Sequence, residues 1–278
     1  STSLADRILD CKAKAVLTAD GNYRGNKKIS IKEIVDEALE RAPVETVIVY
    51  KRTGQETQML AGRDYWWHEA LEGQSDVNQA TEMDSEDMLF ILYTSGSTGK
   101  PKGVVHTTGG YMVYTKYSFE NVFQYCPGDV FWCTADIGWI TGHSYIVYGP
   151  LLAGATTLMF EGVPTYPHPG RFWEIIEKYK VNVFGGVPTV VRSFLEHPDF
   201  SKFDLSSISA IGQGGAPVPP DSVATIESEF SGKVSASNGY GLTETTAAVI
   251  GNSGAAYFAK KDSVGLPYVG TEIRIAAE

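Results

Sequence analysis

The sequence predicts an α/β fold of mostly parallel sheets with helices on both faces. From Met88 onward, short apolar segments of strand length alternate with longer segments whose apolar residues recur at helical spacing. Segments rich in glycine and serine follow several of the apolar segments, at the strand ends where open parallel sheets bind ligands. The expected strands are Leu89–Tyr93, Val130–Thr134, Thr156–Phe160, Val181–Phe184, Ile208–Ile211 and Val234–Ser237, and the expected helices lie near Tyr111–Phe123, Ser144–Leu152, Arg171–Tyr179, Val190–Glu196 and Asp221–Phe230.

The first 87 residues form a less regular segment. Ser30 and Glu33 have the spacing of a capping box, which predicts a helix that begins at Ile31. A buried strand is expected at Val44–Tyr50, and the polar stretch Gly54–Asp87 is expected to be a long connection with a short helix. We therefore divide the chain into a partial N-terminal α/β segment, residues 1–87, and a larger α/β core, residues 88–278.

Composition narrows the class of protein. The formal charge of −10 argues against a large nucleic-acid interface, which requires a basic surface, but a nucleotide site needs only backbone N–H groups and one or two lysines. Three cysteines are too few for a disulfide framework and none has zinc-site spacing, so we expect a reducing compartment and no structural metal. Without a signal peptide or a long apolar stretch, the expected location is the cytoplasm.

The segment Tyr93–Gly103 has the composition of a polyphosphate-binding loop. It directly follows an expected strand, and its residues from Thr94 include four hydroxyl side chains, three glycines and two lysines. Glycines allow close backbone approach, hydroxyls donate to phosphate oxygens and lysine supplies charge. The spacing differs from a Walker A loop and from a dinucleotide-binding fingerprint. A flexible Ser/Gly linker is the alternative, although a linker rarely follows a buried strand so abruptly.

Two more clusters follow expected strands. Ile211–Pro217 offers a surface without bulky side chains on which a flat base can lie, and a simple tight turn is the alternative. Asn238–Thr246 places an aromatic ring, hydroxyls and the carboxylate of Glu244 together. Because Mg²⁺ favours one or two carboxylates together with phosphate oxygens, Glu244 is a candidate metal ligand, the alternative being an ordinary surface residue.

Together these clusters resemble the motifs of the adenylate-forming superfamily, which includes acyl-CoA synthetases, luciferases and peptide-synthetase adenylation domains. Residues 4–180 are most similar to acetyl-CoA synthetases, and residues 181–278 are more similar to medium- and long-chain acyl-CoA ligases. The segments that carry the acetyl-CoA synthetase resemblance are Phe90–Val104, His106–Tyr111, Trp132–Tyr145 and Gly154–Pro164.

The resemblance implies a two-step reaction with ATP, Mg²⁺ and CoA. A carboxylate attacks the α-phosphate of ATP to give acyl-AMP and pyrophosphate, and the thiol of CoA then takes the acyl group. By resemblance, Thr243 contacts the α-phosphate, Glu244 holds Mg²⁺ and Lys102 completes the catalytic set. The residues expected to bind the nucleotide are Thr94, Ser95, Gly96, Ser97, Thr98, Gly99 and Lys100 around the phosphates, and Gly215, Ala216, Pro217 and Tyr240 around the adenine.

The acyl pocket is expected to be lined by Trp139, Ile140, Thr141, Gly214 and Gly241, with ordinary core packing as the alternative for the first three. Acetyl-CoA synthetases have a tryptophan at the position of Gly241. Losing an indole opens space, and each extra buried methylene contributes about 0.8 kcal/mol, so we expect acids longer than acetate to be accepted.

By the same resemblance, the large domain begins upstream of Ser1 and continues beyond Glu278, and the small C-terminal domain with its catalytic lysine lies outside the chain. We therefore expect a fragment. Two other functions stay open: a nucleotide-binding module without catalysis, and an adenylation domain that loads a carrier protein. A purely structural protein would leave the Thr94–Gly103 loop unexplained.

Overall fold

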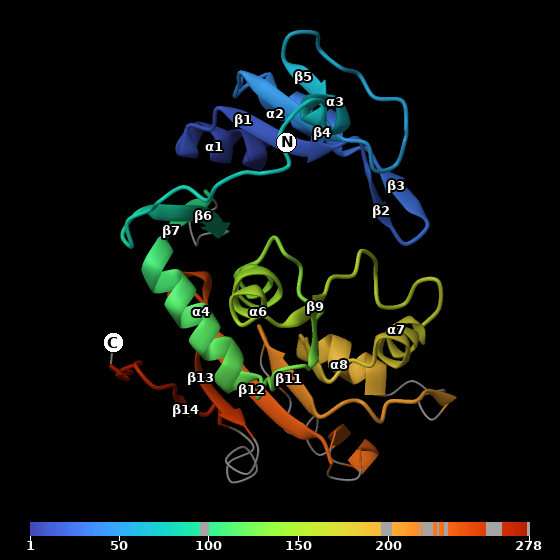
Figure 1. Cartoon of the computed structure of the whole chain (residues 1–278), viewed down its shortest axis with the longest axis vertical. Helices are drawn as coiled ribbons and strands as arrows, with labels where there is room; N and C mark the ends of the chain where they lie inside the picture. Colours follow the sequence, from blue (N-terminus) through green and yellow to red (C-terminus); the bar gives the residue numbers. More distant parts are fainter. Residues whose placement is uncertain are drawn as a thin grey trace. The chain divides into compact units, whose positions relative to one another are not determined.

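The structure is a computed structural model in which the chain forms two compact units, drawn in Figure 1. The first unit comprises Ser1–Val105 with Glu161–Val163, and the second comprises His106–Phe160 with Pro164–Glu278. The domain boundary expected between residues 87 and 88 remains a prediction. The structure describes residues 1–94, 100–195, 202–216, 218, 225–226, 228–230, 233–253 and 263–276.

A three-stranded parallel sheet, in the order β1-β4-β5, organises the first unit. Helices α1 and α2 contribute Ile8, Val35 and Leu39 to a core that also buries Val47 and Val49 of β4. The elements are α1 (Thr2–Cys11), β1 (Ala15–Ala19), the antiparallel pair β2 (Asn22–Arg24) and β3 (Lys27–Ile29), α2 (Ile31–Leu39), β4 (Thr46–Tyr50), β5 (Asp64–Trp66), α3 (Trp67–Leu71) and the paired strands β6 (Met88–Thr94) and β7 (Lys102–Thr107).

Three details of this unit differ from the sequence-based expectations. The capping box is wrong: Ser30 is the N-cap of α2 but makes no side-chain cap bond, because its hydroxyl accepts a 3.0 Å hydrogen bond from the Gln55 amide. The Gly54–Asp87 connection contains strand β5 as well as the expected short helix. The strand expected at Leu89–Tyr93 forms, but among the described residues it pairs with β7 and does not join the large parallel sheet.

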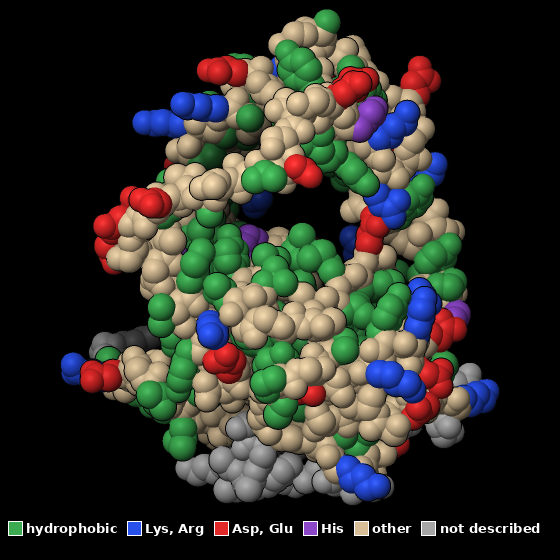
Figure 2. Space-filling view, in the orientation of Figure 1, with side chains coloured by type: hydrophobic (Ala, Val, Ile, Leu, Met, Phe, Trp, Pro, Cys, Tyr) green, Lys and Arg blue, Asp and Glu red, His purple; other side chains and the backbone are tan. Residues whose placement is uncertain are grey.

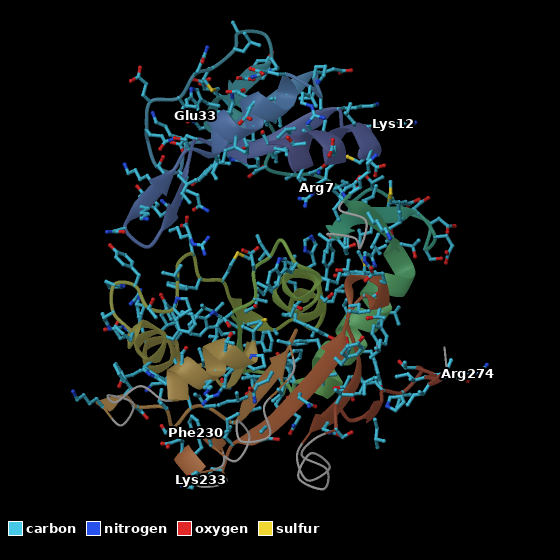
Figure 3. The ribbon with its side chains drawn as sticks, turned by 180° about the vertical axis from the view of Figure 1, so that it is seen from behind. Arg7, Lys12, Glu33, Phe230, Lys233 and Arg274 are labelled. Atoms are coloured by element: carbon cyan, nitrogen blue, oxygen red, sulfur yellow. The ribbon has the colours of Figure 1, made fainter. Side chains whose placement is uncertain are left out.

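An ion-pair network is buried in the first unit. Lys32 Nζ lies 2.7 Å from Asp64 Oδ2 and 2.7 Å from Asp36 Oδ1, and Arg63 bridges the same two carboxylates. The Lys32 and Asp64 side chains are 1% and 0% exposed. On α1, the Arg7 guanidinium carbon lies 5.8 Å from the centroid of the Tyr93 ring, which ties β6 to the helix (Figure 3).

A seven-stranded sheet in the order β14-β13-β12-β11-β10-β8-β9 forms the second unit. The five strands from β12 to β9 are parallel, and β13 and β14 add to one edge antiparallel. The expected fold class is therefore confirmed. The elements are α4 (Thr108–Val122), β8 (Val130–Cys133), α5 (Ile140–Gly142), the π-helix η1 (His143–Tyr148), α6 (Gly149–Leu152), β9 (Thr156–Leu158), α7 (Arg171–Tyr179), β10 (Val183–Gly186), α8 (Pro188–Leu195), β11 (Ala210–Gly214), β12 (Ser235–Gly241), the 3₁₀-helix η3 (Thr243–Thr245), β13 (Ala248–Ser253) and β14 (Leu266–Pro267).

Each face of this sheet has its own core. One face packs Trp132, Phe184 and Ile211 against α7 and α8, and the other packs Phe131 and Val183 against α4 and η1. This split follows from the side-chain alternation of strands, since neighbouring residues point to opposite faces. Figure 1 shows α4 running along the sheet near β12 and β13.

The helix expected at Ser144–Leu152 is confirmed in outline, but its first part is a π-helix, His143–Tyr148, which α6 continues. Most of the helix expected at Asp221–Phe230 lies outside the described residues. On the face visible in Figure 2, Lys and Arg side chains of the described residues are dispersed among acidic ones. Within the part of the chain that the structure describes, no helix is long and apolar enough to cross a membrane.

Candidate functional site: an apolar pocket beside a glycine-walled hollow

On the face of the large sheet that packs against α4, the residues toward the strand ends are mostly glycines. Parallel register aligns Gly185 of β10 with Gly212 of β11, and Gly212 with Ser237 of β12. The next row along the same face pairs Gly214 with Gly239. Because residues two apart on a strand share a face, these rows leave a shallow floor between the sheet and the helices that cover it.

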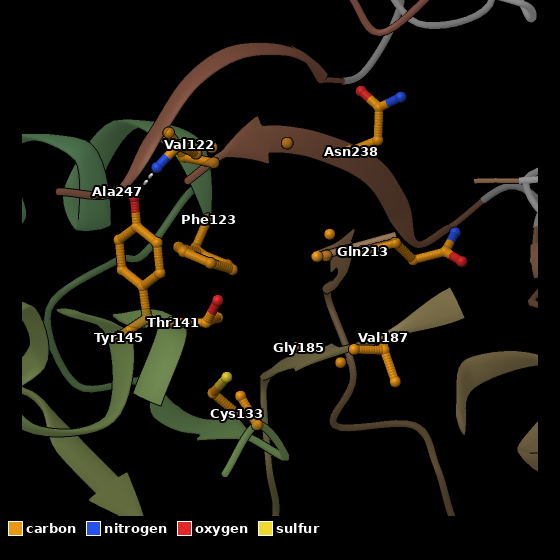
Figure 4. Close-up of a pocket in the computed structure, with 18 of the residues that line it drawn as sticks. Val122, Phe123, Cys133, Thr141, Tyr145, Gly185, Val187, Gln213, Asn238 and Ala247 are labelled. Atoms are coloured by element: carbon orange, nitrogen blue, oxygen red, sulfur yellow. Dashed lines mark hydrogen bonds between the residues drawn. The ribbon is translucent and has the colours of Figure 1, made fainter. Parts of the chain in front are cut away.

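A pocket opens above this floor, and Figure 4 shows several of its lining side chains. It is mostly apolar and holds about 70 Å³ of space for the centres of water-sized molecules. All five residues expected to line the acyl pocket lie on its wall: Trp139, Ile140, Thr141, Gly214 and Gly241. We call this cavity the apolar pocket. Its role in binding an acyl group remains a prediction.

A second concavity, the glycine-walled hollow, lies next to the apolar pocket. Its lining includes three of the four residues expected around adenine, Gly215, Ala216 and Tyr240; the fourth, Pro217, lies outside the described residues. Gly215 has φ +79°, a left-handed conformation that lets β11 turn away at its end. Tyr240 is 45% exposed, so a ligand can reach this residue. The residues shared by the pocket and the hollow are Gly215, Asn238, Gly239 and Gly241.

Gly241 also has a structural role in the sheet, which was not predicted from the sequence. A side chain there would collide with the Ala247 carbonyl oxygen, and its Cβ would lie 2.9 Å from Ala248 Cα. The register of β12 against β13 shifts between Tyr240 and Gly241, so the missing side chain permits this irregular close approach. The expectation that Gly241 enlarges the acyl pocket stays a prediction.

Thr243 and Glu244 lie on the short 3₁₀-helix η3 directly after β12. The turn is held by Thr245, whose hydroxyl oxygen accepts a 2.8 Å hydrogen bond from the Leu242 N–H. Thr246 ends it with φ 71°, an uncommon conformation for a residue with a branched Cβ. Thr243 is half-buried and the Glu244 side chain is exposed. The carboxylate of Glu244 is therefore accessible to a cation.

Two chains of hydroxyl groups connect this turn to the helices. Ser144 Oγ donates to the Thr246 carbonyl at 2.7 Å, so the 2.8 Å contact between Ser144 and Tyr111 has the tyrosine as donor. Beyond the turn, the Ala248 N–H donates to the Tyr145 hydroxyl at 3.2 Å, and Tyr145 donates to Ser118 at 3.0 Å. Burial raises the pKa values of Tyr111 and Tyr145 above the ordinary tyrosine range, which keeps both hydroxyls protonated as donors.

Two histidines lie near the same turn. His106 is buried, and its Nδ1 is 3.5 Å from the Thr246 hydroxyl. Burial, with a smaller contribution from His143, lowers the pKa of His106 below its ordinary value. His143 begins the π-helix, where its Nδ1 lies 3.2 Å from the Trp139 carbonyl oxygen. Because a carbonyl oxygen accepts, this contact requires the proton on Nδ1.

The remaining expected residues belong to the first unit. Thr94 ends β6 and Lys102 begins β7, so these two residues flank the connecting loop in one two-stranded sheet. Lys100 and Lys102 are exposed. The expected phosphate-binding residues Ser95, Gly96, Ser97, Thr98 and Gly99 lie outside the described residues.

Several pocket residues were missed from the sequence, notably Phe123, Tyr145 and Val187, whereas Gln213 lies within the predicted cluster Ile211–Pro217. Phe123 and Tyr145 come from helices that the periodicity did predict, but which helical side chains face a cavity depends on packing. Gly185 and Gly186, directly before Val187 at the end of β10, were the signal that could have drawn attention to this strand end.

Comparison with known proteins identifies the class of protein. The chain belongs to the AMP-binding enzyme family, because the sequence model of that family matches residues 1–278. The resemblance expected from the motifs is thus confirmed. Among its relatives, the chain is 53% identical over 225 residues to the acetyl-coenzyme A synthetase of Streptomyces coelicolor, covering 80% of this chain and 35% of that protein. It is 50% identical over 224 residues to the acetyl-coenzyme A synthetase of Escherichia coli K12, covering 79% of this chain and 34% of that protein.

These matches bear on two expectations: that the chain is a fragment, and that the similarity to acetyl-CoA synthetases is carried by residues 4–180. The chain spans about a third of the length of the curated relatives that it matches, 35% in the Streptomyces coelicolor enzyme. An alignment of 225 residues is longer than the chain up to Lys180, so the similarity to acetyl-coenzyme A synthetases continues beyond that residue.

Proposed function

We propose that the chain is the nucleotide- and acyl-binding part of an AMP-forming acid–thiol ligase that resembles acetyl-CoA synthetase. One observation carries this proposal: the apolar pocket and the glycine-walled hollow share a wall of Gly215, Asn238, Gly239 and Gly241. A mixed anhydride of a carboxylic acid and AMP has an apolar end and a purine end joined at one phosphate. Two adjoining cavities with a common wall fit such a molecule.

In the proposed complex, adenine lies in the hollow between Tyr240 and the turn at Gly215 and Ala216, together with Pro217. The ring of Tyr240 offers a face for stacking, and the glycines let the base approach the backbone closely. Thr243 lies two residues after Gly241, which belongs to the shared wall. In the proposed complex Thr243 contacts the α-phosphate.

The proposed Mg²⁺ ligand is Glu244. Among the described residues there is no group of three or more His, Cys, Asp or Glu side chains that could hold a metal by themselves. That arrangement fits Mg²⁺ bound mainly by phosphate oxygens and water, with one carboxylate from the protein. The ion, when bound with ATP, neutralises charge on the phosphates and so favours attack by an anion.

The loop between Thr94 and Lys102 is proposed to bind the β- and γ-phosphates. Strands β6 and β7, which carry Thr94 and Lys102, pair with each other in a two-stranded sheet. Lys100 and Lys102 supply the positive charge, and Ser95, Gly96, Ser97, Thr98 and Gly99 supply hydroxyl and backbone donors. In the proposed division of the chain these residues belong to the ATP- and acyl-adenylate-binding core, residues 88–278, whereas the compact unit that contains Thr94 and Lys102 is the first.

The proposed chemistry needs positioning more than acid–base catalysis. A carboxylate oxygen forms a bond to the α-phosphorus, the bond from that phosphorus to the α,β-bridging oxygen breaks, and pyrophosphate leaves with the electron pair. In the second step the CoA thiol loses its proton to solvent, its sulfur bonds to the acyl carbon, and AMP leaves. Two anions must be held together in the first step, so charge neutralisation and orientation carry the catalysis.

The test is carboxylate-dependent ATP–pyrophosphate exchange with the 278-residue chain, comparing acetate, butyrate and octanoate. Exchange that requires an acid supports the proposal, and exchange strongest with the longer acids supports a pocket wider than that of an acetate enzyme. ATP binding without exchange favours a nucleotide-binding module, and failure to bind ATP overturns the proposal. Transfer to a carrier protein instead of CoA would identify the carrier-loading alternative.

A further inference from the structure

Phe123, the residue directly after helix α4, lines the apolar pocket. The helix ends at Val122, Phe123 is its C-cap, and Gln124 takes the left-handed conformation with φ 54°. The Gln124 side-chain amide donates a 2.8 Å hydrogen bond to the Ser235 hydroxyl at the start of β12. The end of the helix is thereby fixed above the sheet, and Phe123 with it.

The ring of Phe123 lies directly over the glycine floor. A Cβ built on Gly212 would be 3.0 Å from Phe123 Cε1, and one built on Gly185 would be 3.5 Å from the same atom. Any side chain at Gly212 would therefore displace the ring. The ring is supported from behind by Phe131 and Tyr145, whose centroids lie 5.1 and 4.7 Å away.

The apolar pocket has one end that is open to solvent and one end that is closed. Trp139 on its wall is 63% exposed, and Gly241 is shared with the hollow, so these residues mark the open end. Cys133 is 4% exposed and marks the closed end: a Cβ built on Gly185 would lie 3.8 Å from Cys133 Cα and 3.5 Å from Phe123 Cε1. Gly212, under Phe123, precedes Gly214 by two residues, which is about 7 Å along a strand.

From this arrangement we infer that Phe123 is the end wall of the acyl site and sets the maximum length of the straight-chain carboxylic acid that the chain binds. This inference rests on the proposed function. The carboxylate lies at the open end near Gly214 and Gly241, and the alkyl tail runs over the glycine floor until its last carbon meets the Phe123 ring.

The size of the pocket sets the expected length. A space of 70 Å³ holds about five to seven water-sized groups at roughly 10–15 Å³ each, which corresponds to acids of about five to seven carbons. Each methylene buried before the wall is reached should tighten binding about fourfold, and methylenes beyond the wall should add nothing.

The test measures the Kd of AMP and of its butyl, hexyl, octyl and decyl esters by calorimetry on the 278-residue chain. In the unaltered protein we expect affinity to rise about fourfold per methylene up to the hexyl ester and then to level off. Phe123→Leu should extend the rise to the octyl ester, about 15-fold tighter than in the unaltered protein. Phe123→Trp should move the limit in the opposite direction, to the butyl ester.

Phe119→Leu is the matched control, because Phe119 belongs to the same helix and aromatic cluster but does not line the pocket. It should leave the length profile unchanged, and thermal unfolding of every variant checks the fold. If the unaltered chain binds AMP and the esters but the Phe123 variants keep its length limit, the inference is wrong and the proposed function stands. If the chain binds neither AMP nor any ester, the proposed function fails, and the inference with it.

Discussion

Ser144 Oγ donates a 2.7 Å hydrogen bond to the main-chain carbonyl of Thr246, and this bond ties the π-helix to the turn that carries Thr243 and Glu244. The bond has its own support, because Tyr111 donates to Ser144 and both side chains are buried. Thr246 has a positive φ, so its conformation depends on such contacts. Residues 144 and 246 are distant in sequence, and their contact makes the geometry of the turn a property of the folded unit.

Removing the Ser144 hydroxyl should loosen the turn without removing any group proposed to touch the nucleotide. Ser144→Ala leaves the Thr246 carbonyl without its donor, at a cost of about 1–3 kcal/mol in the free energy of unfolding. We also expect the affinity for AMP to fall, by roughly fivefold for each 1 kcal/mol lost from the bound turn. Urea unfolding and AMP calorimetry measure the two effects. Ser144→Thr, which keeps the hydroxyl, should restore AMP affinity; equal binding by all three proteins would contradict a positioning role.

Gly241 should not tolerate even a methyl group. Because the Cβ would meet the Ala247 backbone, Gly241→Ala should lower the free energy of unfolding by about 1–3 kcal/mol. Gly110→Ala is the control: this glycine lies in α4 and a Cβ there has only a 3.8 Å neighbour, so alanine should stabilise the protein by up to about 1 kcal/mol. Equal unfolding midpoints for the two variants would rule out the close approach at Gly241.

The buried pair of Lys32 and Asp64 should dominate the acid stability of the first unit. Burial alone would raise the pKa of Asp64, but hydrogen bonds from Arg63, the Leu60 N–H and Lys32 outweigh it and lower that pKa to about 2. The unfolded carboxyl titrates near pH 4, so the stabilisation is fully present above pH 4 and is lost as the pH falls toward 2. Denaturant unfolding between pH 2 and 6 should show this loss in the unaltered protein.

Asp64→Asn should flatten that pH dependence and cost about 3 kcal/mol at neutral pH, the lower end for breaking a buried pair, because Lys32 keeps Asp36 as a partner. The exposed pair of Lys180 and Asp204, at the same 2.7 Å distance, provides the comparison. Asp204→Asn should leave the midpoint of unfolding unchanged at neutral pH. Equal losses from the two substitutions would show that burial is not what makes the Lys32 pair important.

His106 should make the second unit less stable in mild acid. Its pKa is lowered chiefly by burial, so the unfolded chain takes up a proton at a higher pH than the folded one. Stability is therefore unaffected well above pH 6.5 and decreases as the pH falls below that value. Thermal unfolding from pH 8 to pH 5 should show a smaller fall in Tm for His106→Gln than for the unaltered protein. Replacing the exposed His68 with glutamine should keep the original slope.

The sequence by itself determined the class of fold and the position of the strand-end clusters. Strands β8 and β10 begin as short apolar runs, Val130–Cys133 and Val183–Phe184, and local apolar pattern is what a chain displays directly. Gly212, Gly214, Gly215 and Gly241 were recognised because each lies in a short glycine-containing cluster that follows an expected strand. The clusters that contain these glycines resemble the motifs of one superfamily, and this resemblance indicated the family.

Tertiary structure alone decided which side chains meet. Phe123 became an end wall, and Ser144 a support for Thr246, only because α4 and a π-helix pack on one face of the sheet. For the same reason, the strand at Leu89–Tyr93 paired with β7, and the Ser30 hydroxyl accepted a hydrogen bond from the Gln55 amide. A pattern of residues fixes local backbone preference, whereas contacts between distant segments depend on register and packing, which no short segment encodes.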